Sequence, residues 1–564
     1  MIEKLNGIVW GAPMIVVILS AGALFSVGTG FFQIRHIIHW LRCTIFSAFG
    51  RRTADRHSVT QFQAMSSALA ATLGTGNIAG VSVAVASGGA GAVFWMWISA
   101  VFGMMTGFAE NVLGIYYRRR TGKGEWAGGS MYYISGGLQQ TRYAKRLAKP
   151  LAAIFAVLCV LSSFGMGNMA QMNSAAGALR DSFGIPAAVT GAVLAAATAV
   201  IILGGVKRVV GITEKLVPFM SCFYILGALW IATVNITELP SVLGAVIEGA
   251  FGIDAVGGGI SGYLIKQAVS MGLRRGVFSN EAGLGTSPAA HAAADVREPC
   301  IQGMWSIFEV FFDTIVMCTL TAVILLASPC DLPTSEQALQ DISLETQYFR
   351  LTDRQTVISR GTPLLVSGEG AELTCGTAYS TEFTMCVSEG ELTFSNIMTV
   401  TGVQSVSEDG ELLFLDMQKN IPLIESAVIE PVQGAALAAF AFSRTFGSAA
   451  GKLLSVAVLM FAFSTVVGWS CFGAQAVQYL FGERAVKPFR VMFVIFTFLG
   501  AVMSFDIVWS ISDLVNGLMA VPNLIALFIL SPTVFRITRN YKRRVFGGED
   551  IAAMLSAYDN EQIY

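Results

Sequence analysis

An apolar run long enough to cross a membrane, residues 60–87, is interrupted near its middle by glycine and polar residues. The interruption at residues 71–80, with the sequence ATLGTGNIAG, contains two close glycines, two threonines and an asparagine, which weaken a helix. Unwound backbone inside a bilayer is tolerated only where protein buries it or where it lines a polar cavity. We therefore predict a broken helix here, the kind of element that forms the substrate and ion site in secondary transporters.

The composition is that of a membrane protein. Of the 564 residues, 54% are hydrophobic and 13% are charged, with a mean hydropathy of +0.63, whereas soluble domains contain about 25% charged residues. The net charge of −1 does not favour a nucleic-acid partner. The nine cysteines form no CxxC pair and no Cys/His cluster, so we expect no transition-metal site and no cofactor.

Long apolar segments predict an all-α polytopic membrane protein with about eleven spans. Lysine and arginine concentrate after every odd-numbered span, which by the positive-inside rule puts the N-terminus outside and the C-terminus in the cytoplasm of a cell-membrane protein. The first segment lacks a basic leader and is long enough to span, so we interpret it as a retained helix. The predicted spans are 8–32, 60–87, 91–117, 150–180, 183–206, 211–235, 255–290 (interrupted), 302–328, 450–480, 487–504 and 508–535.

Residues 329–431 differ from the rest of the chain. They are rich in Thr, Ser, Gly, Glu and Asp, with short β-like runs between glycine-containing breaks. We predict a small β-rich extracellular insert, either a spacer or a lid. The predicted domains are a first transmembrane part at 1–328, this insert, a second transmembrane part at 432–545 and a cytoplasmic tail at 546–564.

The first interruption offers neutral oxygen ligands. Close packing of small residues is one explanation for its glycines, but packing does not explain the asparagine and the threonines. An unwound turn also frees carbonyl groups for a monovalent cation, and the positive ends of two half-helices favour a carboxylate. We predict sodium binding at Thr72, Gly74 and Asn77, and substrate binding at Thr75, Gly76 and Asn77.

Two further polar groups lie in later spans. Gln171 follows Phe164 in the fourth span, and a glutamine in hydrocarbon needs a partner or water. An interhelical hydrogen bond is the alternative to a substrate contact for Gln171. Thr465 and Trp469 are four residues apart in the ninth span, so they share a helix face and form a predicted pocket wall. We predict that all four residues contact substrate, and that Trp469 limits the size of the substrate side chain.

The seventh span also breaks down, and it contains an acid. Residues 276–288 include Asn280, a predicted substrate contact, and Glu281. The triple glycine at 257–259 is an alternative break, which would place Asn280 near a cytoplasmic gate. Because the first break has no acid, a sodium ion is favoured over a proton as the coupling ion. The remaining acids in apolar spans are expected to pair with Lys or Arg near helix ends; they are Glu110, Glu309 and Asp313.

Five segments resemble the alanine or glycine:cation symporters of bacteria and archaea, the sodium:alanine symporter family. They are residues 88–103, 129–134, 279–285, 308–314 and 518–524. The resemblance implies the fold shared with sodium:neurotransmitter symporters, in which two inverted five-helix repeats surround a site of broken helices. It implies that the second, fourth, seventh and ninth spans line that site. Ser464 and Thr465 resemble the paired hydroxyls that bind the coupling sodium in such carriers.

Together these observations predict a symporter that couples sodium entry to the uptake of small neutral amino acids, alanine and glycine, by alternating access. The predicted partners are the amino acid, sodium and the lipid bilayer. A membrane-embedded enzyme is the rival hypothesis, but none of the four histidines has a motif partner. A third possibility is a sensor whose outer segment binds the ligand. Family members usually have a much shorter loop in place of 329–431.

Overall fold

The computed structural model describes most of the chain. It covers residues 2–47, 58–251 apart from 122, 123 and 125, 258–327, 438 and 448–556, and the strands β3–β10 between 349 and 431. Statements about absence below refer to these residues.

The second apolar run folds as two helices joined by a break. Its first helix, α5 (Gln61–Thr72), begins with a capping box, in which Thr60 Oγ1 accepts the Gln63 N–H at 3.1 Å and Gln63 Oε1 accepts the Thr60 N–H at 2.9 Å. A short 3-10 helix, η2 (Thr75–Asn77), follows, and the chain continues as α6 (Ala79–Gly88). The two halves are bent by 61°. The predicted interruption of this helix is confirmed.

The second break lies after α14 (Gly258–Asn280), before the short helix α15 (Pro288–His291). Glu281, Gly283 and Gly285 have φ of 55°, 95° and 80°, so the chain leaves the helix in left-handed conformations. The alternative break at the triple glycine includes Gly257, which lies outside the described residues; Gly258 and Gly259 are the first residues of α14. Side chains bind the backbone N–H groups after Asn280: Asn280 Oδ1 accepts from Ala282, and Glu110 Oε1 accepts from Gly283 and Gly285.

The helices on which the site rests are long and apolar. Eight of the described helices are long and apolar enough to cross a membrane, and the bent pair makes a ninth. The predicted fifth span is shorter, at 16 residues, and α13 was not predicted as a separate helix. The remaining helices are α1 (Ile2–Val9), α2 (Ala12–Gly28), α3 (Phe32–Arg35), α4 (Ile37–Leu41), η1 (Arg42–Phe46), α7 (Gly91–Tyr116), α8 (Ser130–Gln139), α9 (Ala148–Phe164), η3 (Gly165–Met169), α10 (Ala170–Phe183), α11 (Ala187–Ile202), α12 (Val206–Val234), α13 (Leu239–Phe251), α16 (Pro299–Val310), η4 (Phe311–Cys318), α17 (Thr319–Ala327), α20 (Ser448–Phe481), η5 (Glu483–Ala485), α21 (Val486–Val502) and α22 (Phe505–Val545).

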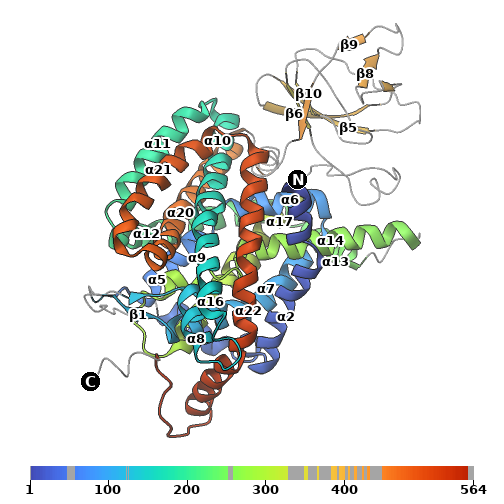
Figure 1. Ribbon diagram of the computed structural model, residues 1–564. Helices are drawn as coiled ribbons and strands as arrows, with labels where there is room; N and C mark the ends of the chain where they lie inside the picture. Colours follow the sequence, from blue (N-terminus) through green and yellow to red (C-terminus); the bar gives the residue numbers. More distant parts are fainter. Residues whose placement is uncertain are drawn as a thin grey trace.

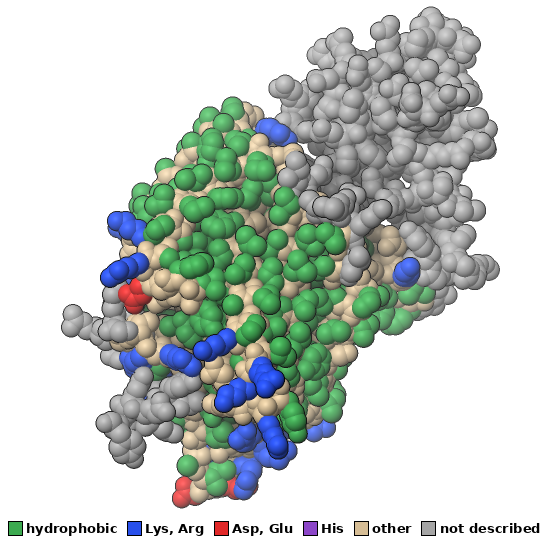
Figure 2. Space-filling view, viewed as in Figure 1, with side chains coloured by type: hydrophobic (Ala, Val, Ile, Leu, Met, Phe, Trp, Pro, Cys, Tyr) green, Lys and Arg blue, Asp and Glu red, His purple; other side chains and the backbone are tan. Residues whose placement is uncertain are grey.

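The helices form one bundle, and α22, red in Figure 1, runs along its length. Within the bundle α7 packs against α2, α14 and α16, while α20 packs against α5, α9 and α10. Hydrophobic side chains cover most of the described face in Figure 2, with Lys and Arg mainly toward its lower end. Large apolar side chains such as Trp230, 66% exposed, point outward, while many polar groups are buried inside. This inside-out distribution suits lipid as the surrounding solvent.

Within residues 329–431, the predicted β-rich insert, the structure describes the short strands β3–β10. β3 pairs antiparallel with β10, β5 lies between parallel β4 and antiparallel β6, and β8 lies between β7 and β9. The predicted domain boundaries at 329 and 431 stay predictions, as does the count of eleven spans. The strands are β1 (Arg119–Arg120), β2 (Trp126–Ala127), β3 (Phe349–Thr352), β4 (Leu365–Ser367), β5 (Phe383–Glu389), β6 (Thr393–Val400), β7 (Gln404–Val406), β8 (Leu412–Leu415), β9 (Pro422–Ile424) and β10 (Val428–Pro431).

Candidate functional site

Gln171 of α10 holds the first residue of η2. Its Oε1 accepts two hydrogen bonds from Thr75, one from the backbone N–H and one from Oγ1, both at 3.0 Å. Its Nε2 donates to the Met166 carbonyl at 3.2 Å, inside the π-helical segment η3. Such a segment leaves carbonyls without helical partners. The structure therefore brings Thr75 and Gln171 together at the break.

A glycine is required at the start of the break. A Cβ on Gly74 would lie 2.6 Å from Thr465 Oγ1 and 2.9 Å from Gln171 Oε1, closer than non-bonded atoms approach. Gly76 faces α14, where its Cβ would lie 3.7 Å from the Ser279 Cα. The break is thus packed closely between α20, α10 and α14.

Two hydroxyls of α20 face the carbonyl of Leu73, the residue that directly follows α5. Ser464 Oγ and Thr465 Oγ1 lie 3.4 and 3.2 Å from the Leu73 oxygen, and both also reach the Phe461 carbonyl. Each hydroxyl carries one proton, so its lone pairs stay available to a cation. Thr72 points back to its own helix, with Oγ1 3.4 Å from the Ala68 carbonyl. The structure therefore shows an oxygen cluster of Leu73, Ser464 and Thr465, here called the α20 cluster.

Asn77 points to the opposite side of the break. Its Nδ2 lies 2.7 Å from Asp313 Oδ1 and 3.0 Å from Ser279 Oγ, and its Oδ1 accepts the Gly74 N–H at 3.1 Å. Ser279 Oγ and Thr314 Oγ1 both donate to Asp313 Oδ2 at 2.8 Å. We call these residues, with Asp313 at the centre, the Asp313 cluster. The residues predicted for a single sodium site thus lie in two separate clusters.

The expectation for the buried acids is not met. Among the described residues Glu110, Glu309 and Asp313 form no ion pair with Lys or Arg, and each is at most 1% exposed; Glu309 contacts His291 instead. Glu281, 3% exposed, also has no Lys or Arg partner in this part of the chain. Neutral donors surround them instead. A buried carboxylate without a cation is costly, so each is a place where a proton or a metal cation would be stabilised. For Asp313 the available signal was its place in the family-like segment 308–314, next to two phenylalanines.

Trp469 links α20 to the second break. Its Nε1 donates to Glu281 Oε1 at 3.1 Å, and Glu281 Oε2 accepts from Thr286 Oγ1 at 2.6 Å. The indole also covers Gly167 of η3, where a Cβ would lie 2.3 Å from the ring. Trp469 is fully buried. It is therefore fixed on two sides, by a carboxylate and by a residue without a side chain.

Asn280 is the last residue of α14, and its side chain binds the turn that follows. Its Oδ1 accepts the Ala282 N–H at 3.0 Å, and its Nδ2 donates to Thr314 Oγ1 at 3.2 Å. Thr314 also donates to Asp313, so Asn280 contacts the Asp313 cluster through it. Asn280 thus sits where the second break meets η4.

Phe164 does not reach either break. Its ring packs on Phe489, Phe493 and Phe496 of α21, with centroid distances of 5.3, 6.1 and 4.6 Å. In a regular α-helix, residues seven apart share a face, which would place Phe164 with Gln171. The π-helical segment η3 lies between them and changes that relationship. The structure therefore separates these two predicted substrate contacts.

A further buried acid, Glu110, binds the backbone of the second break. Glu110 Oε1 accepts the N–H groups of Gly283 and Gly285, each at 3.1 Å, and the side-chain amide of Asn523 at 2.6 Å. Asn523 Nδ2 also donates to the Gly283 carbonyl at 2.9 Å. Glu110 of α7 thereby ties the irregular backbone after α14 to α22.

His291 of α15 lacks the geometry of a hydrolytic triad. His291 Nε2 lies 3.2 Å from Glu309 Oε2, but Ser287 Oγ donates to the same carboxylate at 2.8 Å. The opposite ring nitrogen of His291 contacts Gln302 Nε2 at 2.5 Å. In a triad the serine would contact the histidine. This group therefore reads as a structural network between α15 and α16.

Comparison with known proteins points to transporters. A model of the sodium:alanine symporter family matches residues 1–352 and 420–553. The sodium/alanine symporter AgcS of Methanococcus maripaludis is 34% identical over 541 residues, 96% of each chain. The probable sodium/glutamine symporter GlnT of Bacillus subtilis is 30% identical over 97% of this chain and 91% of its own length.

Among solved structures, the manganese transporter of Eremococcus coleocola is 12% identical, covers 85% of this chain and 78% of its own, and has a TM-score of 0.40. A similarity at that level does not support a comparison of sites. The family assignment depends on the sequence match, which covers most of the chain and includes both breaks. This multi-pass membrane protein belongs to the sodium:alanine symporter family.

Proposed function

We propose that this protein is a secondary active symporter that couples sodium entry to the uptake of alanine and glycine by alternating access. Its family supports coupling of an amino acid to sodium. The observation that carries the proposal is the break at Gly74–Asn77, whose backbone and side chains contact α10, α14, α20 and η4 at once. A site shared by several helices can sense their relative movement.

The substrate binds beside Thr75 and Gln171 in this proposal. The two donors of Thr75, its N–H and Oγ1, are satisfied by one glutamine oxygen. A carboxylate can replace that oxygen, because the Thr75 N–H belongs to the unwound turn and has no helical partner, and the carboxylate is the stronger acceptor. The glutamine amide then turns to bind the same carboxylate. Substrate binding would thereby replace the two hydrogen bonds between Thr75 and Gln171 by bonds from both residues to the substrate carboxylate.

Trp469 favours small side chains in this proposal. It lies across Gly167, which leaves no room between α20 and η3. A ring fixed by Glu281 cannot swing away without leaving a buried carboxylate with one partner fewer. That argument favours alanine and glycine over glutamine, the substrate in the name of one relative.

Sodium would bind in the α20 cluster, and the Asp313 cluster is a second cation candidate. Both supply oxygen atoms, which hard cations prefer. Asn77 connects the Asp313 cluster to the break, because one amide group binds Gly74 through its oxygen and Asp313 through its nitrogen. A cation at Asp313 would attract the amide oxygen and release the Gly74 N–H. Ion binding and rearrangement of the break are then coupled. The coupling free energy between linked sites of this kind is typically about 1–3 kcal/mol.

The deciding experiment is uptake of radiolabelled alanine into proteoliposomes with and without an inward sodium gradient. We expect gradient-dependent accumulation that competes with glycine and not with glutamine. Replacing sodium by choline while the proton gradient is held constant distinguishes sodium coupling from proton coupling. No accumulation of any neutral amino acid under either gradient would contradict the transport proposal, and accumulation with the proton gradient alone would contradict sodium coupling.

A further inference from the structure

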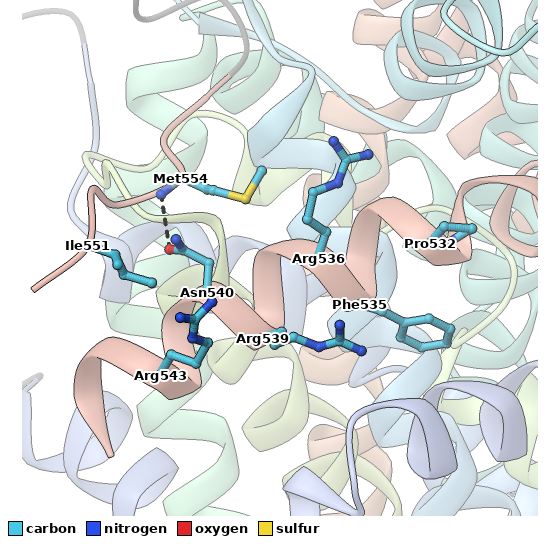
Figure 3. A pocket seen from close by; sticks show the side chains of 8 residues that line it. All are labelled: Pro532, Phe535, Arg536, Arg539, Asn540, Arg543, Ile551 and Met554. Carbon is cyan, nitrogen blue, oxygen red and sulfur yellow. Dashed lines mark hydrogen bonds between the residues drawn. The ribbon is translucent and has the colours of Figure 1, made fainter. Parts of the chain in front are cut away.

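A pocket lies at the end of α22, far from both breaks in the sequence. It has a volume of about 400 Å³, and its walls are the last turns of α22 and the tail after it. Figure 3 shows Asn540 of the helix joined to the tail at Met554, with Ile551 beside it and three arginines along the helix. The pocket therefore has a polar, basic helix on one side and a folded segment on the other.

The tail is fastened to the helix by several hydrogen bonds. Asn540 Nδ2 donates to the Ala552 carbonyl at 2.9 Å, and its Oδ1 accepts the Met554 N–H at 3.2 Å. The Glu549 N–H donates to the Arg543 carbonyl at 3.1 Å. Asn540 thus uses both of its polar side-chain atoms to hold the tail across the pocket. The tail wall of the pocket is therefore fixed by specific hydrogen bonds.

The pocket carries positive charge that the described residues do not neutralise. Arg543 binds the Glu549 carboxylate through Nε, and this hydrogen bond lowers the pKa of Glu549, so that pair stays charged at neutral pH. Arg536 and Arg539 are exposed and have no acidic partner among the described residues. The spacing of 536, 539 and 543 puts all three on one face of the helix. Two guanidinium groups are therefore free for an anion.

The same pocket has an apolar side, formed by residues of α22 that precede the arginines. Pro532 and Phe535 line it, and Phe535 ends the apolar run of α22. Phe535 also packs on Phe25 of α2, with ring centroids 5.9 Å apart. The helix is 41 residues long, about 60 Å at about 1.5 Å per residue, whereas the hydrocarbon layer is about 30 Å thick. The helix is thus longer than a hydrocarbon layer is thick, and the arginines come after its apolar run.

We propose that this pocket binds the phosphate headgroup of an anionic membrane lipid. Arg536 and Arg539 bind the phosphate oxygens, for which the planar guanidinium is well suited. The acyl chains lie along Pro532 and Phe535, and the tail covers the headgroup. Basic pockets at the membrane surface bind anionic headgroups for these reasons. This inference is independent of the substrate and of the coupling ion.

The test is a titration of the full-length protein in detergent with fluorescently labelled phosphatidylglycerol, with phosphatidylcholine as the neutral lipid. Wild-type protein should bind phosphatidylglycerol in preference. Arg536→Gln and Arg539→Gln should each weaken it about fivefold, and the double variant about 30-fold. The single variants keep the test valid should the double variant fail to fold.

The control is the double variant Arg142→Gln, Lys145→Gln, which removes the same charge from an exposed loop. It should bind phosphatidylglycerol as wild type does. Equal loss in the control, or equal binding of both lipids by wild type, would overturn the proposal. Inorganic phosphate should not displace the lipid. Displacement by phosphate would overturn the lipid assignment and identify a site for free anions.

Discussion

Asn77 and Asp313 lie 236 positions apart, yet the amide nitrogen of one is 2.7 Å from the carboxylate oxygen of the other. The amide oxygen of Asn77 meanwhile holds the Gly74 N–H at 3.1 Å. One side chain therefore connects the unwound turn to the only described acid in η4. Any change in the charge of Asp313 reaches the break through a single residue.

Asp313→Asn should lower the apparent sodium affinity of uptake by at least about tenfold, because it removes the buried charge that attracts a cation. The measurement is the sodium dependence of alanine uptake in proteoliposomes. Glu248→Gln, which removes an exposed acid of α13, is the control and should behave as wild type. An unchanged sodium dependence in Asp313→Asn would remove Asp313 from the coupling mechanism.

Asn77→Ala should abolish sodium-dependent alanine uptake while the protein still reaches the membrane. The substitution leaves the Gly74 N–H and part of the Asp313 carboxylate without partners, at about 1–3 kcal/mol for each buried group. Uptake and the amount of protein in the membrane are measured on the same cells. Normal uptake at normal protein levels would show that Asn77 has no role in transport.

Gly74→Ala should inactivate the protein or prevent its folding, because the new Cβ overlaps Thr465 and Gln171. Overpacking of this kind typically costs about 1–3 kcal/mol. Gly80→Ala is the matched control in the same segment, since a Cβ there meets no atom within 4 Å. Thermal unfolding and uptake should separate the two variants. Equal behaviour would mean that the break adapts more freely than its packing indicates.

Trp469→Ala should widen the substrate range to larger neutral amino acids. Because loss of a buried aromatic ring typically costs about 3–5 kcal/mol, Trp469→Phe is measured beside it. The phenylalanine variant keeps most of the ring and loses the bond to Glu281, so it should remain selective for small substrates. Competition of alanine uptake by leucine and glutamine is the readout, and Trp230→Ala, on the exposed surface, is the control. An unaltered range in Trp469→Ala would contradict a limit set by this residue.

The first break was predictable because its cause is local. Gly74, Thr75 and Asn77 weaken a helix wherever they stand, so composition alone located the interruption. For the second break the sequence offered two candidates, residues 276–288 and the triple glycine, and the structure shows irregular backbone after Asn280, within the first of them. Glycines allow an interruption, while the observed one depends on Glu110 of α7, a partner that is far away in sequence.

Side-chain direction was harder to predict than position. Gln171 and Phe164 share a face only in a regular α-helix, and a π-helical segment between them is not visible in residue periodicity. Asp313 was expected to pair with a basic residue near a helix end. Its actual partners were not predictable, because the sequence of one apolar span does not indicate which distant hydroxyls will face it. Pairings of this kind depend on how three helices pack, and sequence patterns within one helix do not contain that information.

The two π-helical segments beside the break, η3 and η4, have a consequence for how the molecule can move. A π turn accommodates one residue more than an α turn, and each segment keeps a carbonyl available to a side chain, that of Met166 for Gln171 and that of Asp313 for Asn77. Rewinding such a segment into an α-helix would withdraw that carbonyl and rotate everything downstream, with no change in the length of the chain. In the proposed transport cycle, the two π-helical segments beside the break could therefore supply the change of shape from within the helices themselves.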